Sequence, residues 1–469
     1  MTFPKYPEYK DSGVEWLGEV PAHWEKLKLS LISIEKCDGP FGSAIKSEHY
    51  RDNGVRVIRL QNIKKYFFNG EDAAYIDADY YRQQIAKSDV IGGDLLVAGL
   101  GDDNNAVGRA CVAPYSIAPA MVKADCFRFR LDTKRAFPDF LAYQLSAGAE
   151  ADAGLLSTGS TRSRIPLSTM GGRIVALPPS HEQVEVSAFL DYETARIDAL
   201  VEEQQRLIEL LKEKRQAVIS HAVTKGLDPD VPMKDSGVEW LGEVPVHWEV
   251  APLGLLSRQI QTGPFGSQLH SHEYVEGGVP VINPSNIVDG EILPDPSSTV
   301  TPEVVERLTH QRLSEGEVVV GRRGEMGRCA VVSSEESGWL CGTGSMKILL
   351  SERADPDFVS MFIRTPLVRG LLQIESVGST MDNLNPEILS RIRVPVPPIE
   401  EQRDLVEKVR LTERKTQRLI SEALQGSELL QERRSALISA AVTGKIDVRG
   451  WQPPEGSTAS SEATQTEMV

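Results

Sequence analysis

The sequence predicts an α+β fold in which two similar globular domains alternate with two long helices. Two observations predict it. The chain repeats itself, because KDSGVEWLGEVPAHWE at residues 10–25 returns as KDSGVEWLGEVPVHWE at residues 234–249 with one substitution. Each repeat also ends in a run of about forty residues with the apolar spacing of a helix. We expect the two helices to pair antiparallel as a coiled coil, with one domain at each end and approximate two-fold symmetry.

The repeat continues through most of the chain. GPFGSAIKSEHY at residues 39–50 corresponds to GPFGSQLHSHEY at residues 263–274, again 224 positions later. Further along the offset becomes 219, where VALPPSHEQ at residues 175–183 corresponds to VPVPPIEEQ at residues 394–402. A chain of 469 residues is too long for one ordinary core. The sequence therefore predicts a tandem duplication of two units.

Within each unit the pattern changes at a double proline. Before it, short β-type runs such as VRVIRLQNI and CFRFRL alternate with short helical pieces. The prolines mark a stop and a new helix start, and Ser180 followed by Gln183 is a capping-box pattern. We expect a first domain at 1–183, a long helix at 184–230, a second domain at 231–402, a second long helix at 403–447 and a flexible tail at 448–469.

Each long helix carries one apolar stripe. In the first helix the predicted stripe consists of Ile197, Leu200, Val201, Gln204, Leu207, Ile208 and Leu211, continued by Val218, Ile219, Ala222 and Val223. In the second it consists of Leu405, Val409, Thr412, Thr416, Leu419, Ala423, Leu430, Leu437 and Ala441. An isolated helix of this length with one apolar face needs a partner, and its duplicate is the partner we expect.

Composition and missing motifs restrict the function. The five cysteines show no CxxC spacing, and we see no secretion signal and no apolar run of membrane-spanning length, so we expect a cytoplasmic protein without a membrane partner. There is no GxxxxGK[ST], no GxSxG and no [DN]PP[YF] signature. The histidines of HSH at residues 270–272 fit a polar loop better than a metal site. The net charge of −16 disfavours nucleic acid but leaves room for a local basic surface. The chain is typical of a binder rather than an enzyme.

The order of WLGEVPxHW, GPFGS and PPxxEQ, followed by AVISHAVT in one unit and ALISAAVT in the other, resembles the specificity subunit of type I restriction–modification systems over residues 10–447. The resemblance implies two target-recognition domains that read a bipartite, asymmetric site in double-stranded DNA. It also implies that the paired helices dock two methyltransferase subunits and that two restriction/translocase subunits join them. It places S-adenosylmethionine (SAM), ATP and Mg²⁺ on those partners, so we expect no cofactor and no catalytic residue in this chain.

Candidate DNA-contacting residues are Arg and small polar side chains on irregular segments, because Arg suits guanine and Asn suits adenine. In the first domain they are Asn104, Asn105, Arg109, Thr161, Arg162 and Arg164. In the second domain they are Arg322, Arg323, Arg328, Ser379, Thr380 and Asn383. Each could instead be a solvated surface side chain. The GPFGS segment could be a structural turn or a loop that faces DNA.

Two other functions stay open. The chain could be a coiled-coil adaptor that binds only proteins, or a nuclease with a hidden acidic metal site, although no constellation supports the latter. The repeated passage itself is interpreted as scaffold or docking surface rather than as a reader of sequence. Its tryptophans, Trp16, Trp24, Trp240 and Trp248, fit intramolecular packing better than docking.

Overall fold

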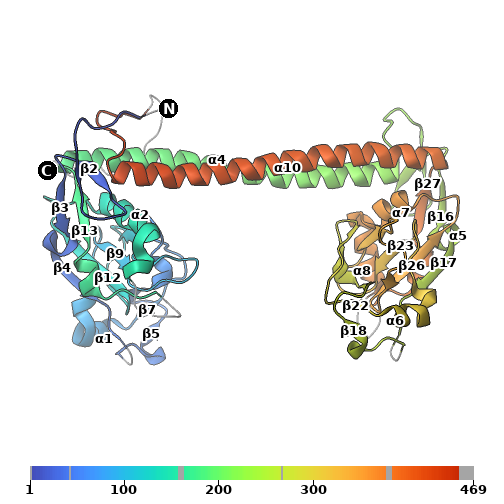
Figure 1. Ribbon diagram of the computed structural model, residues 1–469, viewed down its shortest axis with the longest axis horizontal. Coiled ribbons are helices and arrows are strands. Elements are labelled where there is room, and N and C mark those ends of the chain that lie inside the picture. The colour runs from blue at the N-terminus through green and yellow to red at the C-terminus, as the bar shows by residue number, and fades with distance from the viewer. Residues whose placement is uncertain (1–2, 42–43, 157–162, 266–267, 377–382, 454–469) are drawn as a thin grey trace. The chain divides into compact units, whose positions relative to one another are not determined.

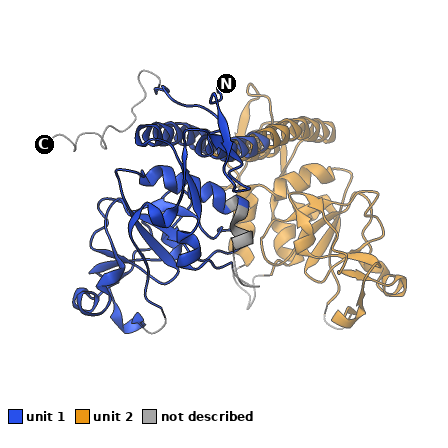
Figure 2. Cartoon of the chain, turned by 60° about the vertical axis from the view of Figure 1, so that its left-hand side comes forward, with its two compact units in different colours: residues 1–204, 425–469 blue, residues 205–424 orange. Residues whose placement is uncertain are grey.

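The computed structural model describes residues 3–41, 44–156, 163–265, 268–376 and 383–453 (Figure 1). The chain divides into two compact units: unit 1 comprises residues 1–204 and 425–469, and unit 2 comprises residues 205–424 (Figure 2). Both divisions fall inside the two long helices, α4 (Ser180–Lys225) and α10 (Ile399–Val442). Each unit therefore contains part of both helices.

Unit 1 has two main sheets. Its strands are β1 (Tyr9–Asp11), β2 (Glu19–Pro21), β3 (Glu25–Lys28), β4 (Ser33–Asp38), β5 (Tyr50–Arg51), β6 (Val55–Ile58), β7 (Tyr75–Ile76), β8 (Asp89–Val90), β9 (Leu95–Ala98), β10 (Ala110–Val112), β11 (Ala120–Val122), β12 (Cys126–Leu131) and β13 (Ile174–Leu177). Its short helices are α1 (Ala78–Tyr80), α2 (Pro138–Leu156) and α3 (Leu167–Gly171). The sheets have the strand orders β10-β9-β12-β4 and β5-β7-β6-β11-β8, and two small pairs, β1-β2 and β13-β3, complete the unit.

Unit 2 repeats this arrangement. Its strands are β14 (Met233–Asp235), β15 (Glu243–Pro245), β16 (Glu249–Pro252), β17 (Ser257–Thr262), β18 (Tyr274–Val275), β19 (Val279–Ile282), β20 (Ile287–Val288), β21 (Glu291–Ile292), β22 (Thr299–Val300), β23 (Val318–Gly321), β24 (Cys329–Val331), β25 (Leu340–Cys341), β26 (Ser345–Leu350) and β27 (Arg393–Val396). Its short helices are α5 (Leu253–Leu256), α6 (Pro302–Arg307), α7 (Pro356–Ile363), α8 (Pro366–Ser376) and α9 (Pro386–Arg391). The orders β17-β26-β23-β24 and β18-β22-β19-β25 match those of unit 1 strand for strand, apart from β8. The duplication seen in the sequence is therefore a duplication of topology.

The sheets form where the sequence alternates or runs apolar. β9 and β23 are buried along their whole length, as expected for a strand covered on both faces. In unit 1 the main core joins β9, β12 and α2 to the start of α4 and the end of α10. In unit 2 the main core joins β23, β26 and α7 to the end of α4 and the start of α10. Each long helix thus helps to build both cores.

The apolar stripes of the long helices are confirmed in part. Ile197, Ile208 and Ile219 are buried and follow one another at intervals of eleven residues, close to three whole helical turns. By contrast, Leu200 and Leu207 are 38% and 44% exposed, so the prediction that they belong to the stripe is wrong. A strict seven-residue repeat drifts around a straight helix, and these positions have drifted out of the seam.

Contacts between the two helices occur inside each unit. In unit 1 the guanidinium of Arg434 on α10 binds the carboxylate of Asp198 on α4 through two bonds of 2.8 and 3.1 Å. In unit 2 the corresponding pair is Arg215 and Gln417, joined by one hydrogen bond of 3.4 Å. The two helices are antiparallel within each unit, because the start of one lies against the end of the other (Figure 1).

Unit 1 is closed by the end of α10 and the residues after it. Ile438, Ala441 and Val442 are fully buried in its main core. The backbone N–H of Asp447 donates to the carbonyl of Pro4 at 2.8 Å. The first and last parts of the described chain are therefore joined in one unit.

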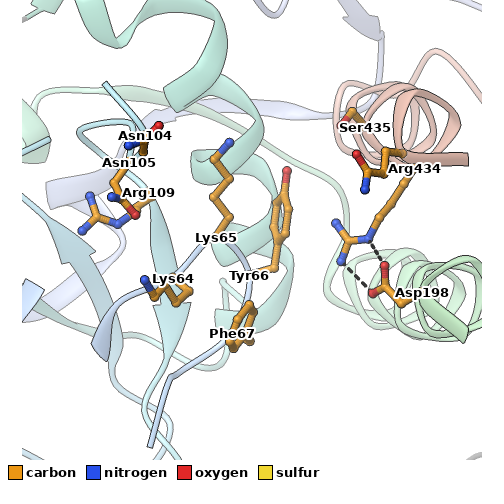
Figure 3. A pocket seen from close by; sticks show the side chains of 11 residues that line it. Lys64, Lys65, Tyr66, Phe67, Asn104, Asn105, Arg109, Asp198, Arg434 and Ser435 are labelled. Atoms are coloured by element: carbon orange, nitrogen blue, oxygen red, sulfur yellow. Dashed lines mark hydrogen bonds and ion pairs between the residues drawn. The ribbon is translucent and has the colours of Figure 1, made fainter. Parts of the chain in front are cut away.

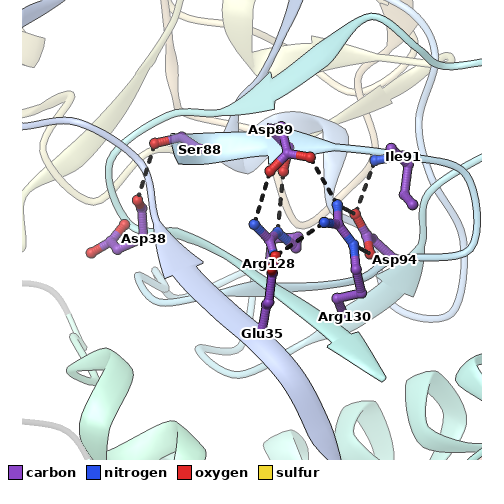
Figure 4. A network of polar contacts seen from close by, with 8 residues as sticks. All are labelled: Glu35, Asp38, Ser88, Asp89, Ile91, Asp94, Arg128 and Arg130. Carbon is purple, nitrogen blue, oxygen red and sulfur yellow. Dashed lines mark hydrogen bonds and ion pairs between the residues drawn. The ribbon is translucent and has the colours of Figure 1, made fainter. Parts of the chain in front are cut away.

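A group of paired charges, of which Arg128 and Asp94 are buried, lies on the sheet of unit 1 (Figure 4). Arg128 and Arg130 of β12 reach Asp89 at 3.0 Å each, and Arg130 also reaches Asp94 at 2.9 Å and Glu35 at 3.1 Å. The hydrogen bond from Arg130 to Asp94 is the main reason that the pKa of Arg130 lies above its usual value. Arg128 and Asp94 can be buried because each of them has a charged partner.

Candidate functional site

The repeated passage ends in a histidine and a tryptophan that bind a carboxylate at the start of α4. In unit 1 Glu182 accepts a hydrogen bond from the indole N–H of Trp24 at 2.9 Å and from the hydroxyl of Tyr6 at 2.6 Å. The Nε2 of His23 lies 2.9 Å from the other carboxylate oxygen of Glu182. Both Trp24 and Glu182 are buried. The passage therefore fixes the entry of the long helix.

Unit 2 repeats this arrangement with one donor fewer. Glu401 accepts from the indole N–H of Trp248 at 3.0 Å, and the Nε2 of His247 lies 2.8 Å from its other oxygen. The side chain of Glu401 is 33% exposed, against 2% for Glu182. The prediction of intramolecular packing is confirmed for Trp24 and Trp248, which are fully buried.

The other two tryptophans of the passage also lie against the protein. The guanidinium of Arg173 stacks on the ring of Trp16 at 5.5 Å, and Trp240 lies 6.4 Å from the ring of Phe362. Both rings are half-buried. Two tryptophans of the passage thus pack into the scaffold of each unit.

The glutamine of PPxxEQ ties the helix start to the turn before α2. In unit 1 Gln183 accepts from the N–H of Phe137 at 2.7 Å and donates to the carbonyls of Arg135 and Pro178, both at 2.9 Å. Gln402 makes the three corresponding bonds in unit 2. Its amide is suited to this because it both donates and accepts.

The capping-box interpretation of Ser180 and Gln183 is wrong. The Oγ of Ser180 donates to the carbonyl of Lys134 at 3.1 Å, and the side chain of Gln183 is fully used by the turn. Both side chains bind backbone groups of residues 134–137 instead of capping the helix. The spacing of Ser180 and Gln183 in the sequence does not reveal these partners.

Arg109 is buried in unit 1 and holds two of its loops together. It is 4% exposed, and its guanidinium donates to the carbonyls of Ile63, Leu60, Leu100 and Ala106 at 2.7 to 3.2 Å. Burial lowers its pKa. Its guanidinium therefore holds the backbone of two loops together, and its assignment as a base-reading side chain stays a prediction.

Asn104 and Asn105 lie at the tip of the loop that Arg109 holds. The backbone N–H groups of both donate to Asp102 at 2.9 Å, and the side-chain amide of Asn105 donates to the same carboxylate. The bond from the Asn105 side chain is the main reason that the pKa of Asp102 is lowered. Asn104 keeps an exposed side chain, whereas that of Asn105 is half-buried and used in the turn.

Arg164 lies beside the first GPFGS segment. Its guanidinium is 5.2 Å from the ring centre of Phe41 and binds Asp125 at 2.8 Å. Asp38 lies close by and accepts the N–H of Asp125 at 3.0 Å. Burial raises the pKa of Asp38 to about 6.

Arg322 lies beside the second GPFGS segment. It is 4% exposed, donates to the carbonyl of Leu384 at 2.9 Å and lies 5.0 Å from the ring centre of Phe265. Burial is the main reason that its pKa is lowered, and the neighbouring Arg323 adds to this effect. Arg322 is thus buried whereas Arg323 is exposed, and base reading by either side chain stays a prediction.

The remaining candidates of unit 2 differ in their surroundings. Arg328 binds Glu325 at 2.9 Å and Pro284 O at 3.3 Å, so it is partly occupied. Asn383 is half-buried, and its Oδ1 has no hydrogen-bond partner among the described residues. Thr161, Arg162, Ser379 and Thr380 lie outside the described residues.

A pocket of about 510 Å³ brings together three of the predicted residues of unit 1 (Figure 3). Its floor and walls come from a hairpin, a loop and the two long helices. The lining residues are Lys64, Lys65, Tyr66, Phe67, Asn104, Asn105, Arg109, Asp198, Gln431, Arg434 and Ser435. Tyr66 lies between two partners, the ring of Tyr143 at 5.2 Å and the guanidinium of Arg434 at 5.4 Å. The pocket is thus rich in cationic, amide and aromatic groups, the groups that suit a nucleic-acid backbone and its bases.

The hairpin residues of this pocket were not among the predicted site residues. The signal was present in IKKYFF at residues 63–68, where adjacent lysines precede aromatic side chains. The corresponding hairpin of unit 2 reads IVDGEI at residues 287–292 and carries no lysine. The two units therefore differ in charge at an equivalent turn.

Within the described part of the chain no three His, Cys, Asp or Glu side chains are grouped as metal ligands. The rings of His270 and His272 stack at 5.3 Å. No helix among the described residues combines the length and the apolar character needed to cross a bilayer.

Comparison with known proteins gives one consistent family. The model of the type I restriction modification DNA specificity domain matches residues 245–424. The chain is 23% identical over 401 residues to the type I restriction enzyme EcoBI specificity subunit of Escherichia coli, covering 84% of this chain and 80% of that protein. It is 21% identical over 456 residues to the putative type I restriction enzyme MjaX specificity subunit of Methanocaldococcus jannaschii, covering 96% and 99%.

Solved structures support the fold. A chain from a study of complex assembly and conformational transition of the type I R-M system aligns with a TM-score of 0.66 at 15% identity, covering 91% of this chain and 99% of that one. The HsdS subunit from Thermoanaerobacter tengcongensis aligns with a TM-score of 0.55 at 14% identity, covering 91% and 98%.

Proposed function

Because the chain belongs to the specificity subunits of type I restriction–modification systems, we propose that it reads a bipartite, asymmetric site in double-stranded DNA, one half with each unit. The observation that carries this proposal is the contrast between a shared scaffold and divergent loops. The sheet orders agree between the units, but GLGDDNNAVGR at residues 99–109 stands opposite RRGEMGR at residues 322–328. Equal scaffolds with unequal loops suit two different half-sites.

We propose that the chain is a specificity subunit, as its named relatives are, and that it carries no catalytic site. We propose that two methyltransferase subunits and two restriction/translocase subunits supply SAM, ATP and Mg²⁺ chemistry in the cytoplasm. A partner common to both units needs a surface common to both. The repeated passage and the paired helices meet that requirement, and they are the docking surface that we assign to the methyltransferase.

In this proposal residues 1–183 and 231–402 are the target-recognition domains, and the helices between and after them set the length of the non-specific spacer. Coiled-coil pairing of those helices would give the two domains a pseudo-two-fold relationship. One helical turn of DNA is roughly 34 Å, a distance that helices of this length can span.

The test is a domain exchange in the full chain. Residues 250–395 are replaced by the corresponding segment of a different specificity subunit, and the variant is produced with its methyltransferase partner. Mapping methylated adenines should show that one half of the site changes and the other half is retained. An unchanged site, or the loss of both halves, would contradict the modular assignment.

The alternative is a coiled-coil adaptor without DNA specificity. The net charge of −16 is the observation in its favour. DNA binding that is absent with all partners present, or that does not weaken with salt, would support the adaptor, because phosphate contacts make affinity fall steeply with salt concentration.

A further inference from the structure

Each GPFGS segment carries an exposed phenylalanine two residues after a closely packed glycine. Phe41 is 49% exposed and Phe265 is 51% exposed. The glycine at the start of each segment presses on a neighbouring strand end: a Cβ on Gly39 would lie 2.1 Å from the backbone of Lys123, and one on Gly263 would lie 1.9 Å from that of Gly342. Only glycine allows this close approach, so the backbone that leads into Phe41 and Phe265 is held in place.

An arginine stacks on each ring, but from a different position in the two units. Arg164 stacks on Phe41 at 5.2 Å, and Arg322 stacks on Phe265 at 5.0 Å. Backbone hydrogen bonds define the equivalence, because Ile165 N donates to Gly99 O in unit 1 as Leu384 N donates to Arg322 O in unit 2.

Arg322 therefore occupies the position of Gly99, and Arg164 occupies the position of Asn383. Copying one unit from the other would have left the arginines at equivalent positions. Instead, an arginine stacks on the phenylalanine in both units although it comes from different backbone positions. This indicates that the phenylalanine ring has a function.

The polar groups around the two rings are different. In unit 1 the carboxylates of Asp38 and Asp125 lie beside Arg164. The strand registers place Thr262 at the position of Asp38, and Gly344 at that of Asp125, so unit 2 has no carboxylate at either place. Unit 2 has Arg323 instead, exposed next to the stacked pair.

This contrast decides the kind of partner. A protein subunit common to both units would meet like charges at both rings, but two carboxylates accompany the arginine at one ring and a second arginine accompanies it at the other. Two different DNA half-sites would meet unlike charges, since carboxylates accept from cytosine and guanidinium groups donate to guanine or phosphate. The DNA specificity domain at residues 245–424 contains Phe265, Arg322 and Arg323.

We propose that Phe41 and Phe265 are equivalent DNA contacts of the two units, each ring packing on a sugar or base whatever the sequence, while the polar groups around it give each unit its own base preference. The proposal rests on the proposed function of the chain. Arg322 is a positioning residue, since it is buried beneath Phe265 and its Nε is bound to backbone. Arg323 supplies the donors that face DNA.

The test uses the full chain in complex with its methyltransferase partner and a duplex that carries the mapped site. Phe41→Ala and Phe265→Ala should each weaken binding roughly tenfold, the effect of losing one stacked aromatic contact. The dependence of affinity on salt should stay the same, because no charge is removed. Leu255→Ala, which removes a side chain that is 71% exposed in the same unit, is the matched control and should bind as the parent does.

Two further variants separate ring support from base reading. Phe265→Tyr keeps the ring and should retain affinity. The double variant Arg322→Gly with Asn383→Arg moves the arginine of unit 2 to the position used in unit 1, and it should recover binding that Arg322→Gly alone loses. If the parent complex binds its site and both alanine variants bind it equally well, the inference is overturned. Parent complex that does not bind a split site would instead overturn the proposed function.

Discussion

The indole N–H of Trp24 donates to the carboxylate of Glu182, a bond of 2.9 Å that joins the repeated passage to the first residues of α4. The same oxygen also accepts from Tyr6. A buried donor that loses its acceptor costs more than the bond itself contributes, because it was desolvated on folding. This single carboxylate is therefore central to the stability of unit 1.

We expect Glu182→Ala to lower the free energy of unfolding by about 2 to 4 kcal/mol, since it leaves two buried donors without an acceptor. Glu401→Ala should cost less, because Glu401 is more exposed and water can replace it. Glu182→Gln keeps one acceptor oxygen and should be milder than the alanine variant. Urea unfolding followed by tryptophan fluorescence measures all three, and equal losses for Glu182→Ala and Glu401→Ala would contradict the assignment.

Asp139 should make unit 1 less stable as the pH rises from about 4 to about 6. Burial, and then the carboxylate of Asp191, raise its pKa from 3.8 to about 6. The folded state thus holds a proton that the unfolded chain releases first, so stability falls across this window and the penalty stays constant above it. Asp139→Asn should be more stable than the parent at pH 7 by about 1 to 2 kcal/mol, allowing for partial exposure, and equal to it below about pH 4.

Unit 2 offers the matched control for this prediction. Asp357 stands at the position of Asp139, and Arg410 stands at that of Asp191, so the carboxylate is paired with a cation there. Burial raises the pKa of Asp357 as well, but Arg410 opposes that rise, so Asp357→Asn should stabilise the protein at pH 7 less than Asp139→Asn does. Equal stabilisation by both asparagine variants, measured by urea unfolding between pH 4 and pH 8, would show that burial alone decides the effect.

Arg109→Ala should destabilise unit 1 without changing how DNA affinity depends on salt. Four carbonyl groups lose their donor, and a loss of about 3 kcal/mol follows from unsatisfied buried groups. Thermal unfolding gives the stability, and binding at several salt concentrations, at a temperature where the variant is folded, gives the slope. A shallower slope would show that Arg109 neutralises a phosphate after all.

Converting the lysine hairpin of unit 1 to that of unit 2 should change the salt dependence. The double variant Lys64→Val with Lys65→Asp should lower the slope of log affinity against log salt by about 1 to 2, since each phosphate contact contributes about 0.9. Lys87→Ala removes an exposed lysine elsewhere in unit 1 and serves as the control. An unchanged slope would remove this hairpin from the DNA interface.

The thiols should react slowly and in a fixed order. Cys111, Cys126, Cys329 and Cys341 are buried, and burial raises the pKa of Cys341 to about 12. Cys37 is the half-buried one, although burial raises its pKa as well. Titration with a thiol reagent at pH 8 should label Cys37 first and the other four only on unfolding, because the thiolate is the reactive form.

Much of the architecture could be predicted because duplication leaves a visible record. The repeated passages predicted a duplication, and the main sheets of the two units do share their strand orders apart from β8. The apolar spacing predicted two long helices, which the structure places at Ser180–Lys225 and Ile399–Val442. Strands of two residues such as β5 could not be foreseen, because their pairing depends on partners far along the chain.

The individual site residues were harder to predict, because their roles also depend on partners far along the chain. Arg109 reads as an exposed arginine in a glycine-rich loop, but its carbonyl partners Ile63 and Leu60 lie more than 40 positions earlier. Phe41 and Phe265 read as parts of a turn, and the arginine on each ring comes from a different place. A residue pattern indicates local geometry, whereas these roles come from contacts across the fold.

The closure of unit 1 by residues 438–448 has a consequence for synthesis. Unit 2 is one continuous segment and can fold as soon as it leaves the ribosome, whereas unit 1 waits for more than 200 further residues after its first part emerges. At about 5 to 20 residues per second that delay is on the order of ten seconds or more. The half that is translated first is therefore completed last, and a prematurely terminated chain would carry an open apolar core that chaperones and proteases can recognise.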